Sequence, residues 1–319
     1  MVEEVELDDE GDRYQQVQQF ITDSPWDALE VMAKVAGDTS APYASQSTYQ
    51  EQDIGDILDE SAHLKKGTQS VGVARQDAWV IGKVDNCQGG VYASLVWHSQ
   101  TSLINTRRYL PECWTEDDER REKAGIPKGK RSHSTKPQLG LEMLKADLAA
   151  GVRLGWVGGD GLYGHGYEFS YAVDDLGLMF LFDGHRAQSV DLEKPVIWVP
   201  EKKPGRGRTP TLPKTDAHPI TVNTDQEGLC ERDWQEVAVR DTTKGVLTLS
   251  MHVRRVWVWD QHALQARCRT LVISRNKADN RLKYGLSHAD VGTTPLERFA
   301  YMQAQRYWVE RAFQDAKSE

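Results

Sequence analysis

The sequence has few cysteines, and none of them form a metal-binding pair. The 319 residues include four, at Cys87, Cys113, Cys230 and Cys268, with no Cys-x-x-Cys spacing. This argues against a structural zinc site and against the disulfide framework of a small secreted domain. We therefore expect a protein of a reducing, cytoplasmic compartment.

Long apolar runs and excess positive charge are also missing. No run approaches the roughly 20 apolar residues that a membrane-spanning helix needs, so no membrane partner is expected. The first twelve residues, MVEEVELDDEGD, lack the basic and apolar parts of a signal peptide. A formal net charge of −9 argues mildly against a large nucleic-acid surface, unless basic residues cluster locally.

The N-terminal part, residues 1–52, is predicted to be a helical segment. Residues 1–12 are expected to be disordered, and Tyr14, Val17 and Phe20 then recur at helical spacing. A second helix is expected to begin with Ser24 as its N-cap, and residues 36–52 are polar and turn-like.

Residues 53–183 have the pattern of a mixed sheet with helices on its faces. Strands are predicted at 54–58, 68–74, 78–84, 90–97, 154–158 and 178–182. Helices are predicted after Thr135 and at 167–174, whereas residues 105–131 are charged and irregular. This order of elements indicates an α/β fold.

Residues 184–292 interrupt this pattern with a predicted antiparallel β insert. The insert begins with a flexible basic loop, EKKPGRGR at 201–208, and continues into alternating apolar and polar residues around 247–253. We expect it to form a separate β-rich lobe beside the sheet.

The last stretch, residues 293–319, carries the clearest helix signal. Thr294, Pro295 and Glu297 fit an N-cap, a first-turn proline and a capping box. An apolar stripe follows at positions 299, 302, 309, 313 and 316, and Arg306, Glu310 and Lys317 share one side of the helix beside it. An amphipathic helix with salt-bridging charges is the ordinary interpretation.

Three acidic residues stand out by their positions. Asp59 is expected to end the first strand, Asp160 to end the strand at 154–158, and Glu310 to lie mid-helix. Carboxylates that converge in this way supply the oxygen ligands that Mg²⁺ prefers, as in two-metal phosphoryl transfer sites. Taken singly, each aspartate could equally be a turn, loop or N-cap residue.

Several segments, taken in order, resemble bacterial insertion-sequence transposases of the DDE superfamily. The last helix carries the Arg, Glu and Lys of the Tyr-Arg-Glu-Lys signature found in the group with a β insert before the Glu. The segments are residues 58–61, 65–67, 70–76, 82–88, 108–111, 155–164 and 307–317.

The resemblance implies an RNase H-like core and a metal-dependent reaction on DNA. The triad would be Asp59, Asp160 and Glu310, holding two Mg²⁺ ions for which Mn²⁺ can substitute. Water would first cut at the transposon end, and the freed 3′-OH would then attack target DNA. The implied partners are double-stranded DNA, as transposon ends and target, and a second copy in a homodimer on DNA, in a nucleoid-associated location.

Further residues are predicted to contact DNA. Lys65 and Lys66 follow the first Asp, Arg306 and Lys317 flank the Glu, and the insert contributes Arg254, Arg255, Trp257 and Trp259. The tryptophans alternate on one side of a strand, where packing is the ordinary interpretation and stacking on an unpaired base the alternative.

The sequence departs from the pattern at Gln303, where the signature has Tyr. It also stops two residues after Lys317, and nothing before the first strand resembles a basic end-recognition domain. We therefore expect a truncated copy, and the main alternative is a non-catalytic DNA-binding remnant. A glycoside hydrolase using two carboxylates would need an aromatic cleft, and the basic surroundings of Asp59 and Glu310 argue against one.

Overall fold

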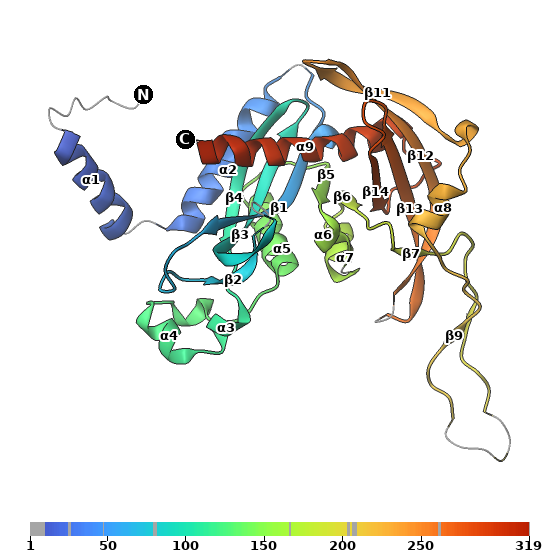
Figure 1. Ribbon diagram of the computed structural model, residues 1–319, viewed down its shortest axis with the longest axis horizontal. Helices are drawn as coiled ribbons and strands as arrows, with labels where there is room; N and C mark the ends of the chain where they lie inside the picture. Colours follow the sequence, from blue (N-terminus) through green and yellow to red (C-terminus); the bar gives the residue numbers. More distant parts are fainter. Residues whose placement is uncertain are drawn as a thin grey trace.

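A computed structural model describes residues 10–24, 27–46, 48–78, 82–165, 167–202, 205, 209–260 and 263–318 (Figure 1). Helix α1 is Glu10–Asp23, so the expected disorder is wrong for residues 10–12, and residues 1–9 lie outside the described part. The predicted apolar stripe of α1 is exposed: Tyr14 and Phe20 are 72% and 61% accessible.

The second helix, α2 (Ala28–Ala44), begins and ends later than predicted. Its N-cap is Asp27, whose side chain accepts a hydrogen bond from the Leu29 amide at 2.7 Å, so Ser24 is not the cap. Residues 36–44 are helical instead of turn-like. The tertiary structure explains this extension, because Tyr43 is buried with its ring 5.4 Å from that of Trp97.

The core sheet has the RNase H-like topology that the resemblance implied. Strands β1 (Gly55–Leu64), β3 (Lys83–Trp97) and β4 (Gln100–Arg108) form an antiparallel meander. Strand β5 (Trp156–Gly159) then pairs parallel with β1, and β6 (Met179–Asp183) pairs parallel with β5. Helix α5 (Lys136–Ala149) connects the two halves, and its capping box of Thr135 and Gln138 agrees with the predicted start.

Several strand predictions fail in this region. The strand predicted at 68–74 is a loop up to residue 72, and the strand predicted at 78–84 contains a turn at Gly82, before β3 begins at Lys83. Strand β1 runs to Leu64, so Asp59 lies in the middle of it instead of at its end. Strand β4 was missed, because its polar residues hide the alternation; only Ile104 and Asn105 of it are fully buried. The remaining core elements are β2 (Val73–Ala78), α3 (Glu112–Thr115), α4 (Asp118–Lys123), α6 (Gly161–His165) and α7 (Tyr167–Asp175).

The insert is rich in β-structure, as predicted, but its main strands do not form a separate sheet. Strand β14 pairs with β6 through Gly285 and Leu286, so the four long strands of the insert join the core strands in one ten-stranded sheet, in the order β11-β12-β13-β14-β6-β5-β1-β3-β2, with β4 beside β3. The bounds of these strands are β11 Gln235–Thr242, β12 Gly245–Asp260, β13 Gln265–Asn276 and β14 Leu282–Ser287.

Short elements complete the insert. Two small two-stranded ribbons form in the insert. One pairs β7 (Ser189–Val190) with β10 (Ile220–Thr221), and the other pairs β8 (Ile197–Trp198) with β9 (Lys214–Thr215). Helix α8 spans Val222–Glu227. At the outer edge, β11 carries a register shift between Ala238 and Arg240 where it pairs with β12.

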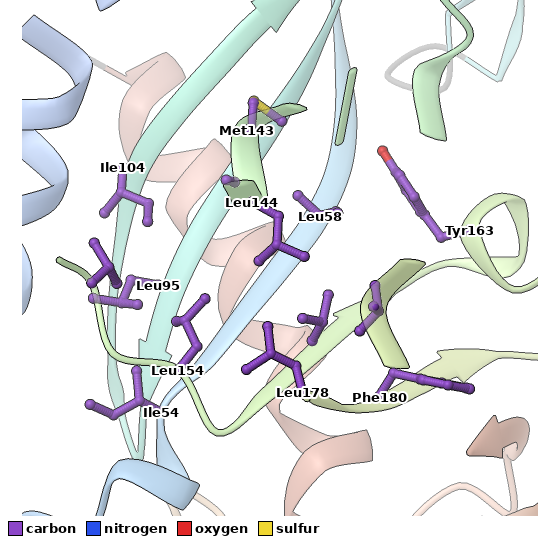
Figure 2. Packing of buried hydrophobic residues seen from close by; sticks show 14 of the residues in the cluster. Ile54, Leu58, Leu95, Ile104, Met143, Leu144, Leu154, Tyr163, Leu178 and Phe180 are labelled. Carbon is purple, nitrogen blue, oxygen red and sulfur yellow. The ribbon is translucent and has the colours of Figure 1, made fainter. Parts of the chain in front are cut away.

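Hydrophobic cores lie on the two faces of the core sheet. On one face, Leu58 packs with Met143 and Leu144 of α5, as Figure 2 shows. On the other, Ile57 packs with Phe299 and Val309 of α9 (Leu296–Ser318), which crosses the sheet in Figure 1. Helix α9 therefore lies against the face of β1 opposite to α5.

Candidate active site

Strand register places three aspartates in one row. Leu58 of β1 pairs with Gly159 of β5, and Gly159 pairs with Phe182 of β6. The residues that follow these are Asp59, Asp160 and Asp183. Because neighbouring strands lie about 4.8 Å apart, the row brings three carboxylates to the same level of the sheet.

The side chain of Asp59 lies on the α9 face. Successive strand residues point to opposite faces, and Leu58 belongs to the α5 core while Ile57 belongs to the α9 core. Asp59 shares the face of Ile57, and only 13% of its side chain is exposed. A carboxylate is thus held under α9, partly shielded from water.

Arg306 of α9 lies between two of these carboxylates. Its Nη1 donates to Asp183 Oδ2, and its Nη2 lies 3.5 Å from Asp59 Oδ2. One guanidinium is therefore shared by the first and last members of the row.

Burial and neighbouring charges together set the pKa values at this position. Burial raises the pKa of Asp59 to about 6; Arg306 opposes this shift, and the charges of Asp160 and Glu310 add to it. Burial disfavours the charge of Arg306, but the adjacent carboxylates outweigh it, and the pKa of Arg306 is raised. Asp160 is held in place by the Leu162 amide, which donates to its Oδ1 at 2.9 Å.

The carboxylates have the negative charge that a divalent cation requires, but they do not lie close enough together to coordinate one. Glu310 is exposed on α9, near enough for its charge to act on Asp59. Among the described residues, no three His, Cys, Asp or Glu side chains are close enough together to hold a metal ion. The carboxylate oxygens of Asp59 and Asp160 are of the ligand type that Mg²⁺ and Mn²⁺ prefer.

Basic residues predicted near the first Asp lie further along β1. Lys317 donates from Nζ to Ser61 Oγ at 2.6 Å. Burial lowers the pKa of His63, and Lys317 and Lys65 lower it further, so these cations share the far end of the strand. Lys66 is exposed beyond it.

Two charged residues of this site were missed by the sequence analysis. Asp183 comes just after a predicted strand, as Asp160 does, and this shared position could have identified Asp183 from the sequence. Lys136, the first residue of α5, pairs with Glu60 and feels the charges of Asp160 and Asp59, although burial lowers its pKa. Its side chain is 28% exposed.

The predicted DNA contacts of the insert have partners within the protein. Arg254 pairs with the buried Asp225 at 2.7 Å, and Arg255 with Asp290 at 2.5 Å. Trp257 is half-buried with the Lys194 ammonium 5.3 Å from its ring centroid. Trp259 is also half-buried, and both tryptophans alternate with the core residues Val256 and Val258.

Gln303 does not face solvent. Its side chain is 4% exposed, and neither amide atom has a hydrogen-bond partner in the described part of the chain. A contact to DNA at this position would require α9 to shift.

Comparison with known proteins then identifies the family. The profile described as "DDE superfamily endonuclease" matches residues 1–246. The chain belongs to the DDE superfamily endonuclease family. The matched segment contains Asp59 and Asp160 and ends before α9, so the family match does not include Glu310.

Other comparisons add little. No curated protein matches the chain. The chain is similar to the crystal structure of the NurA nuclease from Sulfolobus solfataricus, at 8% identity over 92% of this chain and 83% of that one. The TM-score of 0.32 is too low to support an argument. No helix in the described residues is long and apolar enough to cross a membrane.

Proposed function

We propose that this DDE superfamily endonuclease is a transposase that cuts DNA at transposon ends and transfers the ends to target DNA. The observation that supports it best is the row of Asp59 and Asp160 on adjacent parallel strands, with Asp59 under α9. Glu310 on that helix is the proposed third carboxylate. Asp59, Asp160 and Glu310 would hold divalent ions, Mg²⁺ or Mn²⁺, which supply charge stabilisation for an in-line displacement at phosphorus.

The protein's own residues would bind and orient the DNA. Lys136 lies near Asp160 and Asp59, and Lys317 and Lys65 lie at the far end of β1; all three would contact phosphates. Arg306 and Lys66 are further candidates. In the insert, Arg254 and Arg255 would need to leave their ion pairs to reach DNA, whereas Trp257 and Trp259 are partly accessible for base stacking.

The proposed organisation follows from these roles. Residues 53–183 and 293–319 would form the catalytic core, residues 184–292 the insert and residues 1–52 an N-terminal segment. A homodimer on DNA would allow two transposon ends to be processed together. The protein would then act at the nucleoid.

A non-catalytic DNA-binding remnant is the second candidate. It is favoured by the buried Gln303 and by the absence, among the described residues, of three carboxylates gathered closely enough for a metal. Such a protein would bind the element's ends without cutting them.

The deciding experiment measures DNA nicking by the purified chain with Mg²⁺ or Mn²⁺, on duplexes that carry the element's own ends. Asp59→Asn, Asp160→Asn and Glu310→Gln are each expected to lower the rate at least about 10³-fold, because charge stabilisation at the phosphorus is lost. Glu142→Gln, at an exposed position on α5, is the matched control. Cleavage that survives the three substitutions would refute the mechanism, and binding without any cleavage by the wild type would favour the remnant.

A further inference from the structure

A small cavity lies between α7 and the strands of the insert. Its volume is about 20 Å³. The polar residues that line it are Tyr167 and Ser170 of α7 and Arg269 of β13, and Phe180 of β6 is among the apolar ones. A space of this size holds about one water molecule or one oxygen atom of a larger ligand. The cavity therefore offers a narrow binding position beside the guanidinium of Arg269.

The two hydroxyl groups of the cavity already donate hydrogen bonds within the protein. Tyr167 donates to the Trp259 carbonyl oxygen at 2.7 Å, and Ser170 donates to the Tyr167 carbonyl oxygen at 2.9 Å. Nη1 of Arg269 donates to the Cys268 carbonyl oxygen at 3.0 Å, but its Nη2 is buried and has no hydrogen-bond acceptor in the described part of the chain. Nη2 of Arg269 is therefore the donor of the cavity that is left for a ligand.

The nearest charges and rings do not supply an acceptor for this nitrogen. Asp174 acts on Arg269 through its charge, but its carboxylate pairs with His288 Nε2 at 3.6 Å. The ring centroids of Tyr171 and Phe180 lie 5.8 and 5.6 Å from the guanidinium carbon. Such ring contacts attract a cation but accept no strong hydrogen bond.

A buried charge of this kind is costly without a partner. Arginine stays ionised in proteins, and a buried ion needs an ion pair and hydrogen bonds to offset its lost hydration. Burial lowers the pKa of Arg269, and the charge of Arg267 lowers it further, against the opposing charge of Asp174. His288, whose ring lies 4.5 Å from that of Phe180, has a buried Nδ1 that also lacks a partner among the described residues. Two nitrogens without partners, one of them cationic, therefore lie around the ring of Phe180.

We propose that this cavity is an anion subsite, in which Arg269 binds one oxygen of a phosphate group. Guanidinium groups suit phosphate oxygens, which accept short charge-assisted hydrogen bonds. The phosphate can come from the DNA backbone or from free inorganic phosphate. The position favours DNA, since the cavity is also lined by Gly164 of α6, the short helix that begins directly after Asp160. The subsite goes beyond the proposed function, because it requires neither a metal ion nor cleavage.

The first test is thermal unfolding of the full chain in inorganic phosphate, compared with sodium chloride at equal ionic strength and without metal ions. Phosphate is expected to raise the unfolding temperature of the wild type. Arg269→Met removes the guanidinium and is expected to weaken phosphate binding at least about tenfold, so most of that rise should be lost. Arg275→Met is the matched control, because it removes an equal charge from the same strand, where Arg275 pairs with Glu231 at 3.1 Å; its response to phosphate should match that of the wild type.

The second test distinguishes the two sources of the phosphate. Binding of a DNA duplex is titrated at several salt concentrations, and Arg269→Met should reduce the slope of log affinity against log salt by about one if the ligand is a backbone phosphate. If Arg269→Met abolishes the response to inorganic phosphate and leaves DNA binding unchanged, the ligand is free phosphate. If it alters neither, the subsite is refuted. A wild type that does not nick DNA would count against the proposed function and leave the subsite unaffected.

A measurement on the wild type serves if Arg269→Met does not fold. The charge of Arg269 helps to lower the pKa of His288, after the larger effect of burial, so phosphate bound at Arg269 should raise the pKa of His288. NMR titration of the histidine signals in chloride and in phosphate measures this change, and His288→Asn identifies the signal. An equal pKa of His288 in the two salts would contradict the proposal.

Discussion

At the scale of single residues, Asp59 links stability to pH in an uncommon direction. Burial raises the pKa of its carboxyl group from 3.8 to about 6 in the folded protein. The folded state therefore binds this proton more tightly than the unfolded state, and the free energy of unfolding falls as pH rises from about 4 to about 6. The ionised carboxylate of Asp59 is therefore destabilising in the folded protein.

Asp59→Asn is expected to remove this pH-dependent contribution. The shift is about 2 pKa units, so relative to the variant the wild type should lose at most about 3 kcal/mol of stability between pH 4 and pH 7. Urea unfolding of both proteins at several pH values measures the difference in their free energies of unfolding. The titration of other groups, such as Asp147, contributes equally to both proteins and cancels in this difference. A difference that does not change with pH would contradict this account.

Lys136 is expected to contact a DNA phosphate. Lys136→Gln should weaken DNA binding, with the slope of log affinity against log salt reduced by about one, because one phosphate contact is lost. Titrations at several salt concentrations test it. Lys145→Gln, at an exposed position on α5, is the matched control, and equal effects of both variants would assign the loss to net charge alone.

Some site residues were predictable from the sequence and others were not. Asp160 was found because it follows a short apolar strand and begins the turn into α6. Asp59 was singled out by an expected position at the end of the first strand, although it lies mid-strand. Lys136 was missed because its proximity to Asp59 comes from the packing of α5 on β1, which local sequence patterns do not contain.

At the scale of elements, α9 depends on its first turns. Phe299 is fully buried against the sheet, whereas Ala316 in the last turns is exposed, so the predicted stripe packs only in part. The capping signals placed the start of the helix correctly to within two residues, since it begins at Leu296. Strand β4 was missed because its pairing with β3 across a tight turn outweighs its polar composition.

Phe299→Ala is expected to destabilise the protein by about 3–5 kcal/mol, because it leaves a cavity between α9 and the sheet. Tyr307→Ala, on the exposed side of the same helix at 47% accessibility, should cost less than about 1 kcal/mol. Chemical denaturation of the two variants provides the comparison. Similar losses would mean that α9 is not held by its buried face.

At the scale of the whole molecule, the core and the insert share one sheet. Their junction is the pairing of β14 with β6, where a Cβ on Gly285 would lie 3.0 Å from Leu181 Cδ1 and 3.3 Å from the Phe182 carbonyl oxygen. The chain order of the strands suggested two units, because pairing across a long interruption is not visible in a sequence. The close approach at Gly285 is what makes them continuous.

Gly285→Val is expected to weaken both parts together. The added side chain would separate β14 from β6, and amide hydrogen exchange should quicken in β13 of the insert and in β5 of the core. Exchange that quickens only in the insert would show that the two parts are independent units. Thr248→Val, near the start of β12, keeps strand geometry and is the control. Gly245→Val is unsuitable because Gly245 has a φ of +107°.

An open sheet of this length must also avoid joining the sheets of other molecules. Strand β11 ends the sheet with unpaired backbone groups on its outer side, which could add a strand from another chain. The register shift between Ala238 and Arg240 breaks its regular geometry, and Arg240 and Asp241 place opposite charges there. An irregular and charged edge is a poor template for a strand from another chain, so we expect β11 to resist aggregation between molecules.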